Sequence, residues 1–298
     1  MKALALVGCA LLLPLEAHAG ATLTPLLTFD GWTAGHAEGG LVEGPNGVLY
    51  GTTAYAGKSD WGVVFSLTPP STSGGNWTLT DLYSYSGVTA GTRPVGTPAI
   101  DSSGDLYVVD SSQRLIQLAP APAGSQWTAT TIAPRVANQV ISDKNGNIYT
   151  VDVDQSEDFI NFVKYDSPSS PGDLPSSNSL CNLGEYEGSL DIYIVSDNTG
   201  GFYITNLNDI LHAVPPTTSG GTWSCPVVYE VSDTGGLSFN SPVVDAFGNI
   251  WSIYNTSSSS NLFEISPPAT AGANWNGVVV ATFPGVVTGF TIARSGSI

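Results

Sequence analysis

The feature of this sequence that most constrains its fold is a short pattern that recurs about every 50 residues. Each copy has an apolar stretch, a turn rich in Asp, Asn and Gly, and then Gly-x-[Leu/Ile/Phe]-[Tyr/Trp]. Asp and Asn side chains bond their own backbone in turns, and Gly adopts positive φ, so each copy predicts a β-hairpin. The copies lie at 41–50, 99–107, 140–149, 195–203 and 243–251, and a sixth begins at Phe290.

A second marker keeps the same period and adds strands to each unit. Trp77, Trp127, Trp223 and Trp275 each follow a link rich in Pro, Ser, Thr or Gly and open another β-rich run; the third unit lacks this Trp. A further strand lies between the two markers, as at 62–67. Four strands in about 50 residues are typical of a β-propeller blade. The chain is therefore predicted to be all-β.

The N-terminus predicts how the repeats end. Residues 22–31 match residues 78–87 at five of ten positions, so the mature chain begins on a fourth strand. We expect about six four-stranded blades in one domain, 20–298, with the last blade incomplete and shared between the two termini. A fragment of a longer repeat chain is the alternative. The expected units are 36–87, 88–134, 135–184, 185–233, 234–285, and a partial unit from 286–298 plus 21–31.

The first 19 residues have the layout of a secretory signal. Lys2 supplies the charged region, residues 3–15 the apolar region, and Ala17-His18-Ala19 the cleavage site. A lipoprotein signal at residues 6–9 would leave too little sequence before Cys9. We therefore expect a secreted, periplasmic or cell-surface protein that starts near Gly20, with no membrane span, because no later segment is long and apolar enough.

Charge and cysteine content narrow the partners further. The chain has 8 Lys and Arg against 25 Asp and Glu, a net charge of −17, which argues against binding nucleic acid. Cys181 and Cys225 remain after signal cleavage, and an oxidising compartment permits one disulfide between them. They lie in neighbouring repeat units, so the sequence leaves the bridge open.

Part of the first unit resembles a known family. The runs 49–53, 62–70 and 82–87, with Trp77, resemble the bacterial GloVer-type tandem repeat of exported proteins. The resemblance implies export and brings no catalytic residues. The other units have the looser pattern Asp-x-x-Gly-x-[Leu/Ile]-Tyr, as in residues 101–110, which resembles NHL-like and lactonase-like propellers.

The candidate metal site is an alternation of oxygen-bearing side chains at Asp152, Asp154, Ser156 and Asp158. Oxygen ligands at every second position can wrap a calcium ion, although the turn glycine and the last glutamate of an EF-hand loop are absent. A solvated acidic edge is the competing interpretation. Calcium is the only cofactor that the sequence indicates.

A second acidic set recurs at one phase of the repeat. A ring of carboxylates could bind a cation, but the fixed offset from the turn glycine favours a local turn in which each Asp bonds its own backbone. The members are Asp101, Asp143, Asp197 and Asp245.

The candidate ligand-binding residues gather in the first unit. Trp32, Tyr55 and Trp61 lie close to the divergent loops of the first unit and could form an aromatic platform for a sugar or peptide, and Trp32 and Trp61 are out of phase with the repeat. His36 lies in a Gly-rich segment expected to be a loop. His212 alternates with apolar residues, as a satisfied strand residue would. No zinc or serine-hydrolase motif is present.

These observations leave three functional hypotheses. The leading one is an exported, monomeric propeller that acts as a binding or cell-envelope scaffold for an extracellular ligand, carbohydrate or protein. The second is a secreted lyase, lactonase or glycosidase with its site in the propeller funnel. The third is a structural repeat segment of a longer surface protein. Fold alone does not choose between them.

Overall fold

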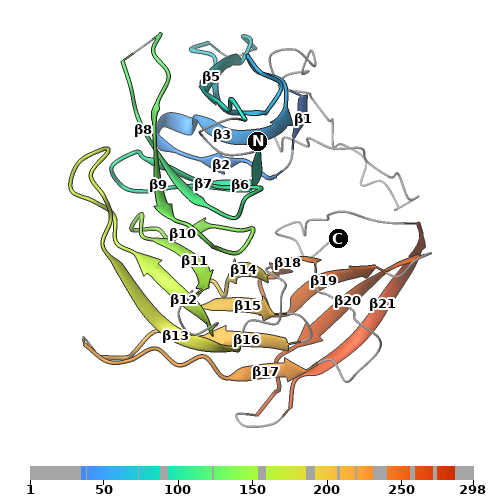
Figure 1. Ribbon diagram of the computed structural model, residues 1–298. Helices are drawn as coiled ribbons and strands as arrows, with labels where there is room; N and C mark the ends of the chain where they lie inside the picture. The colour runs from blue at the N-terminus through green and yellow to red at the C-terminus, as the bar shows by residue number, and fades with distance from the viewer. Residues whose placement is uncertain are drawn as a thin grey trace. The chain divides into compact units, whose positions relative to one another are not determined.

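A computed structural model shows an all-β chain (Figure 1). It describes residues 35–37, 39–72, 74–87, 93–122, 124–153, 159–185, 192–206, 209–218, 220–230, 240–255, 259–270 and 274–285. Within these residues there are 21 strands and one short 3-10 helix, η1 (Pro45–Gly47). No helix among them is long and apolar enough to cross a membrane.

The strands form five antiparallel sheets, and the chain divides into two compact units. Unit 1 comprises residues 1–134 and 168–174 and holds the first two sheets. The first sheet contains β1 (Gly35–Ala37), β2 (Val42–Glu43), β3 (Leu49–Tyr55), β4 (Val63–Thr68) and β5 (Thr78–Ser84). The second contains β6 (Pro94–Ile100), β7 (Leu106–Asp110), β8 (Leu115–Ala119) and β9 (Thr128–Ala133).

Unit 2 comprises residues 135–167 and 175–298 and holds the other three sheets. The third sheet contains β10 (Ile141–Ser142), β11 (Ile148–Val153), β12 (Phe159–Tyr165) and β13 (Ser177–Glu185). The fourth contains β14 (Ile192–Ser196), β15 (Phe202–Asn206), β16 (Asp209–Ala213) and β17 (Val227–Glu230). The fifth contains β18 (Asn240–Val244), β19 (Ile250–Asn255), β20 (Ser259–Ser266) and β21 (Asn276–Pro284).

Strand order within each sheet follows the chain, so each is a simple meander. In the first sheet the innermost position is split, because β1 and β2 both pair with β3. Each of the five sheets lies, to within one residue at its ends, inside one of the five complete repeat units expected from the sequence. Trp77, Trp127 and Trp275 stand directly before the fourth strand of their sheets. The composite blade from 21–31 and 286–298 lies outside the described residues and stays a prediction.

Sheets within a unit are held together by their apolar faces. In unit 1, Val64 and Leu82 of the first sheet share a buried cluster with Leu106, Val108 and Leu118 of the second. Alternate residues of a strand point to opposite faces, so this packing uses the period-two pattern of the repeats. The first sheet therefore presents one face to the second, as neighbouring propeller blades do.

Unit 2 has the larger aromatic core. The rings of Tyr149 and Phe162, from the third sheet, meet Phe202 and Trp223 of the fourth, with ring centroids 4.5 to 6.3 Å apart. Aromatic pairs at such spacing add stabilisation beyond their buried area. Trp223, a repeat marker in the sequence, is thus a packing residue.

Candidate functional site

The candidate site lies at the end of unit 1 where the second strand of each sheet passes to the third. Loop 56–62 between β3 and β4 and turn 111–114 between β7 and β8 lie at this end, and β6 begins there after Arg93. The N–H of Ser111 donates to the carbonyl of Arg93 (2.9 Å), and Pro94 pairs with Asp110, so the start of β6 is fixed to turn 111–114.

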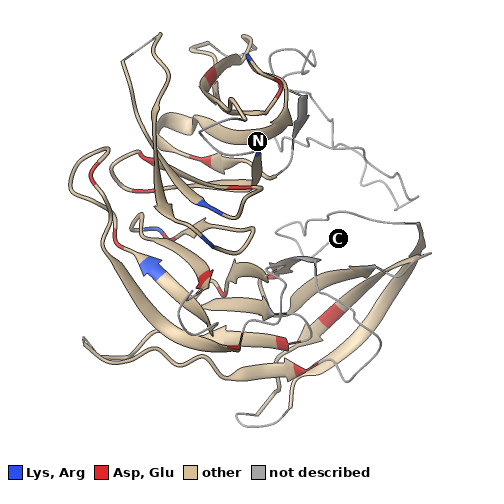
Figure 2. Ribbon diagram, viewed as in Figure 1, with Lys and Arg blue, Asp and Glu red and all other residues tan. Residues whose placement is uncertain are grey.

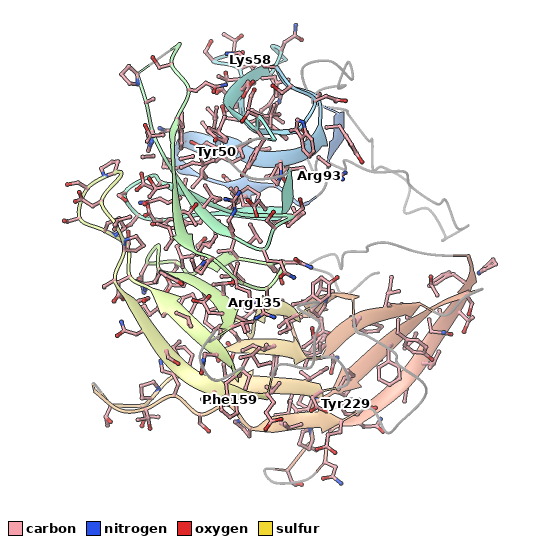
Figure 3. The ribbon with its side chains drawn as sticks, viewed as in Figure 1. Tyr50, Lys58, Arg93, Arg135, Phe159 and Tyr229 are labelled. Carbon is pink, nitrogen blue, oxygen red and sulfur yellow. A yellow bond between two sulfur atoms is a disulfide. The ribbon has the colours of Figure 1, made fainter. Side chains whose placement is uncertain are left out.

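Tyr55 and Arg93 are in contact, and Trp61 lies in loop 56–62 at the same end of the sheets; we call these three residues the aromatic–arginine cluster. The guanidinium of Arg93 lies over the ring of Tyr55, with Cζ 4.9 Å from the ring centroid, and Nη1 donates to the Tyr55 hydroxyl. The Tyr55 and Trp61 side chains remain 40% and 39% exposed, whereas most large aromatic residues of the first two sheets are buried or half-buried. Figure 3 labels Arg93 among the side chains of this unit.

Loop 56–62 holds the two aromatic residues at its ends. The N–H of Gly62 donates to the carbonyl of Ala56 (3.1 Å), and the N–H of Ala56 donates to the Asp60 carboxylate (2.9 Å). Ala56 and Asp60 have φ of 74° and 59°, in the left-handed region that non-glycine residues rarely adopt. A loop closed by its own hydrogen bonds keeps Tyr55 and Trp61 in fixed positions.

Two glycines let the cluster pack closely. A Cβ at Gly87 would lie 2.4 Å from Cε2 of Trp61, so the indole rests directly on the backbone there. A Cβ at Gly62 would lie 2.1 Å from the Thr53 carbonyl oxygen and 2.9 Å from Cδ of Pro94, the residue after Arg93. Loop 56–62 and the start of β6 are therefore in contact through glycine.

Turn 111–114, next to the start of β6, holds an ion pair between a buried Asp110 and a half-buried Arg114. Asp110, whose side chain is fully buried, accepts hydrogen bonds from Nε and Nη2 of Arg114 (3.0 and 2.8 Å) and from the N–H groups of Ser112 and Arg114 (both 3.0 Å). Burial, followed by the negative charge of Asp110, raises the pKa of Tyr85 well above its ordinary value. The charge of Arg114 is thus balanced locally.

The surroundings of Arg93 differ from those of Arg114. Among the described residues Arg93 forms no ion pair, although acidic residues outnumber basic ones 25 to 8 in the chain and the few Lys and Arg are scattered (Figure 2). Its guanidinium is held by an aromatic ring and a hydroxyl instead of a carboxylate. Within the described part of the chain, no carboxylate therefore compensates the positive charge of Arg93.

The structure places the predicted ligand residues as follows. Tyr55 and Trp61 both belong to the cluster. His36 was expected in a loop, but it lies in β1, because Gly35 and Ala37 pair with Tyr55 and Thr53 of β3. Trp32 lies outside the described residues. Arg93 was missed by sequence reasoning, since no repeat pattern marks it.

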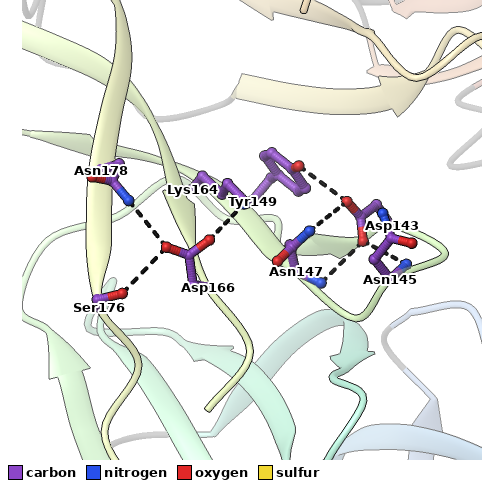
Figure 4. A network of polar contacts seen from close by, with 8 residues as sticks. All are labelled: Asp143, Asn145, Asn147, Tyr149, Lys164, Asp166, Ser176 and Asn178. Atoms are coloured by element: carbon purple, nitrogen blue, oxygen red, sulfur yellow. Dashed lines mark hydrogen bonds and ion pairs between the residues drawn. The ribbon is translucent and has the colours of Figure 1, made fainter. Parts of the chain in front are cut away.

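The recurring aspartates form turns, as the fixed offset predicted (Figure 4). Asp143 accepts the N–H groups of Asn145 and Asn147 on one oxygen (2.8 and 3.0 Å), and the Asn147 amide and Tyr149 hydroxyl on the other (2.8 and 3.1 Å). Its oxygens are thereby used inside one turn. Hydrogen bonds to the corresponding backbone positions recur at Asp101, Asp197 and Asp245.

In the fourth sheet a histidine takes part in this turn. Nε2 of His212 lies 2.8 Å from the Asp197 carboxylate, and its ring stacks on Tyr203 with centroids 4.4 Å apart. Burial alone would raise the pKa of Asp197, but hydrogen bonds from His212, Thr199 and Gly201 outweigh burial and lower it. His212 is therefore a satisfied strand residue, as predicted.

One member of the predicted calcium site is described, and it is not a solvated edge residue. Asp152, on β11, accepts the Tyr165 hydroxyl (2.6 Å) on one oxygen, while its other oxygen is buried without a hydrogen-bond partner. Burial raises the pKa of Asp152 to about 6. Asp154, Ser156 and Asp158 lie outside the described residues. Elsewhere in the described ranges no group of three or more His, Cys, Asp or Glu is arranged around a metal position, and the calcium site stays a prediction.

The buried carboxylate of Asp105 was not predicted from the sequence. Asp105 stands where the third and fifth units have Asn147 and Asn249, and it is fully buried. One of its oxygens accepts the side-chain amide of Gln117 (2.6 Å) and the N–H of Gly172 (2.7 Å). Its other oxygen and the amide oxygen of Gln117 are buried without a hydrogen-bond partner among the residues that the structure describes. Desolvation by burial raises the pKa of Asp105.

Cys181 and Cys225 form a disulfide in the structure, with Cα atoms 6.2 Å apart. Cys181 lies on β13, the fourth strand of the third sheet, and Cys225 just before β17, the fourth strand of the next. Both pack against the aromatic core of unit 2. The bridge therefore links two neighbouring sheets at their outer strands.

Comparison with known proteins shows the fold. No protein-family profile and no curated protein matches the sequence. The periplasmic gluconolactonase PpgL of Pseudomonas aeruginosa superposes with a TM-score of 0.58 at 13% identity, covering 89% of this chain and 77% of that one. A streptogramin B lyase gives a TM-score of 0.50 at 12% identity, covering 86% and 73%.

These similarities are in fold alone, because the identities are low. The chain has a β-propeller fold, in agreement with the resemblance to lactonase-like propellers. The resemblance to GloVer-type repeats has no support from the comparisons. The number of blades and the closure of the ring remain predictions.

Proposed function

We propose that the protein is an exported β-propeller that binds a carbohydrate through the aromatic–arginine cluster. The observation that carries this proposal is the placement of Tyr55, Trp61 and Arg93 at one loop end of unit 1, with both rings exposed. Single exposed apolar residues need no explanation, but two aromatic rings beside an arginine have the composition of binding hot spots.

The chemistry of the cluster suits a sugar. The exposed faces of Tyr55 and Trp61 can stack on the C–H faces of a pyranose ring, and a guanidinium offers several N–H donors to ring hydroxyls. The site costs little ordering entropy on binding, because hydrogen bonds within loop 56–62 already fix the rings. Ligand sites on loops held by a rigid scaffold are the usual arrangement in propellers and other β folds.

The test is a titration of the mature protein with maltotriose, cellotriose and chitotriose, followed by calorimetry and Trp fluorescence. We expect W61L and Y55A each to weaken binding about tenfold or more, which is about 1.4 kcal/mol. F247S is the matched control, because Phe247 is 80% exposed in a turn of unit 2 and makes no part of the cluster. If no carbohydrate binds, or if F247S weakens binding as much as W61L, the proposal fails.

Export rests on the N-terminal signal. Edman sequencing of protein recovered from the culture fluid or periplasm should start at or near Gly20. A start at Met1 in an exported fraction would contradict it.

A second candidate function is an enzyme that uses Asp152 as a general base. A carboxyl with a pKa of about 6 can take up a proton near neutral pH, and Tyr165 orients it. The structural similarity to a gluconolactonase suggests glucono-δ-lactone as the probe. The hydrolysis rate should rise with pH through about 6 and be lost in D152N. Tyr165 lowers the pKa of Asp152, so Y165F should move the midpoint to higher pH. Absence of hydrolysis above the buffer rate would remove this candidate.

A further inference from the structure

We infer that the aromatic–arginine cluster selects acidic sugars, with Arg93 receiving the carboxylate while an aromatic ring receives the sugar face. This inference rests on the proposed carbohydrate binding and names the ligand class. Nothing in the fold comparison assigns such a specificity.

Backbone contacts hold Arg93 in a fixed position. Its carbonyl accepts the N–H of Ser111, and the next residue, Pro94, is paired with Asp110 in the second sheet. Pro94 in turn packs against the backbone position of Gly62. The side chain thus leaves the backbone at a point held from two sides, which reduces the entropy lost when it engages a ligand.

The contact of the Arg93 guanidinium with Tyr55 leaves hydrogen-bond donors for a ligand. The Cζ atom of Arg93 lies over the Tyr55 ring, and Nη1 donates to the Tyr55 hydroxyl. A guanidinium has five N–H donors in a rigid fork, so the bond from Nη1 to Tyr55 leaves further donors on its edge. This geometry matches a planar carboxylate through two parallel hydrogen bonds.

Arg93 differs from Arg114 and Lys164 in how its positive charge is balanced. Nε and Nη2 of Arg114 both bind Asp110, and Lys164 binds Asp166, whereas Arg93 has no carboxylate partner among the described residues. An anionic ligand group would supply that partner. The overall charge of −17 opposes long polyanions, so the inference is restricted to a short ligand with a single carboxylate at this position.

A ligand that carries both a carboxylate and a sugar ring can use Arg93 and the aromatic rings together. A simple carboxylate would use Arg93 and leave Tyr55 and Trp61 exposed. A hexuronate carries its carboxylate on the carbon next to the ring, so an arginine and an aromatic face on the same loop end can engage it together. Phosphate and sulfate have no apolar face for the rings. The cluster therefore favours uronate-type sugars over inorganic anions.

The experiment compares trigalacturonate with its fully methyl-esterified form and with maltotriose, on the whole mature protein. Trigalacturonate should bind at least tenfold more tightly than the ester. R93Q should reduce the affinity for the acid about tenfold or more and the affinity for the ester by much less, so that the preference for the acid is lost. R93K keeps the charge but loses the fork, and it should also lose most of the preference. The unfolding midpoint of each variant shows whether it is folded.

The outcomes separate this inference from the proposed function. Equal binding of acid and ester, or an acid preference that survives in R93Q, would overturn the carboxylate role and leave carbohydrate binding standing. Binding of inorganic phosphate or sulfate in competition with trigalacturonate, at equal concentrations, would overturn the sugar-acid class. Absence of binding by all three saccharides would refute the proposed function itself.

Discussion

Replacing Asp105 by Asn should stabilise the protein at neutral pH. The Asp105 carboxylate is fully buried and has one oxygen without a partner, and the amide oxygen of Gln117 beside it has none either. An Asn side chain keeps an oxygen that can accept the Gln117 amide and the Gly172 N–H, and its own amide can donate to Gln117. It also restores the residue type found at Asn147 and Asn249.

The expected size follows from the unpaired oxygens. A buried polar atom without a partner costs about 1–3 kcal/mol, and the substitution relieves two acceptors while also removing a buried charge. Some of the gain is lost because the carboxylate accepts two hydrogen bonds more strongly than an amide oxygen does. We expect D105N to raise the free energy of unfolding by about 1–2 kcal/mol at pH 7.5.

The gain should depend on pH with a definite sign. Because the pKa of Asp105 is raised in the folded state, the wild type is most stable when this group is protonated. It loses stability as pH rises from about 3.9, the ordinary Asp pKa, through the raised value. D105N lacks this loss, so its advantage should be absent at low pH and should grow toward neutrality.

The assay is urea unfolding at pH 4.5, 6.0 and 7.5, with hydrogen exchange at the Gly172 N–H as a local readout. D173N is the control, because Asp173 is exposed and offers Gln117 only its carbonyl; it removes the same charge and should change stability by less than about 0.5 kcal/mol. A D105N protein less stable than wild type at pH 7.5, or a gain that does not vary with pH, would refute the reasoning.

Three further predictions concern unit 2. Reducing the Cys181–Cys225 disulfide, which closes a loop of 44 residues, should lower stability by up to about 4 kcal/mol, as measured by unfolding with and without reductant. F162A should cost about 3–5 kcal/mol in urea unfolding, because the side chain is fully buried among aromatic rings; a cost under about 1 kcal/mol would contradict the packing. D143A should cost about 1–3 kcal/mol, since it leaves the buried Tyr149 hydroxyl and two backbone N–H groups without their acceptor, and D143N should recover part of that loss.

The repeat spacing was sufficient to predict the sheets, because the signals that define a hairpin lie within ten residues of each other. Asp143 and Tyr149 are six residues apart, and their hydrogen bond is a property of one turn. Trp127 and Trp275 marked the fourth strands for the same reason, since each stands at a strand start. Local patterns of this kind can be recognised in a single sequence.

The contacts that define the candidate site were harder to predict from the sequence. Arg93 and Tyr55 are 38 residues apart and meet only because two sheets pack, and Gly172 reaches Asp105 across 67 residues. Trp61 was predicted because it breaks the phase of the repeat, and Tyr55 because it lies close to the divergent loops of the first unit. Nothing comparable marks Arg93, while Asp105 carried one weak signal, an acid where two other units have Asn.

The membership of segment 168–174 in unit 1 has a consequence for how the chain acquires its structure over time. This segment belongs in sequence to the connection between β12 and β13, yet its Gly172 and Asp173 supply hydrogen bonds to Asp105 and Gln117. A chain that emerges N-terminus first, from the ribosome or across a membrane, must extend about 40 residues past Pro134 before these bonds are made. During that interval the Asp105 carboxylate stays hydrated and ionised, and its burial marks the moment at which the first two sheets are finished.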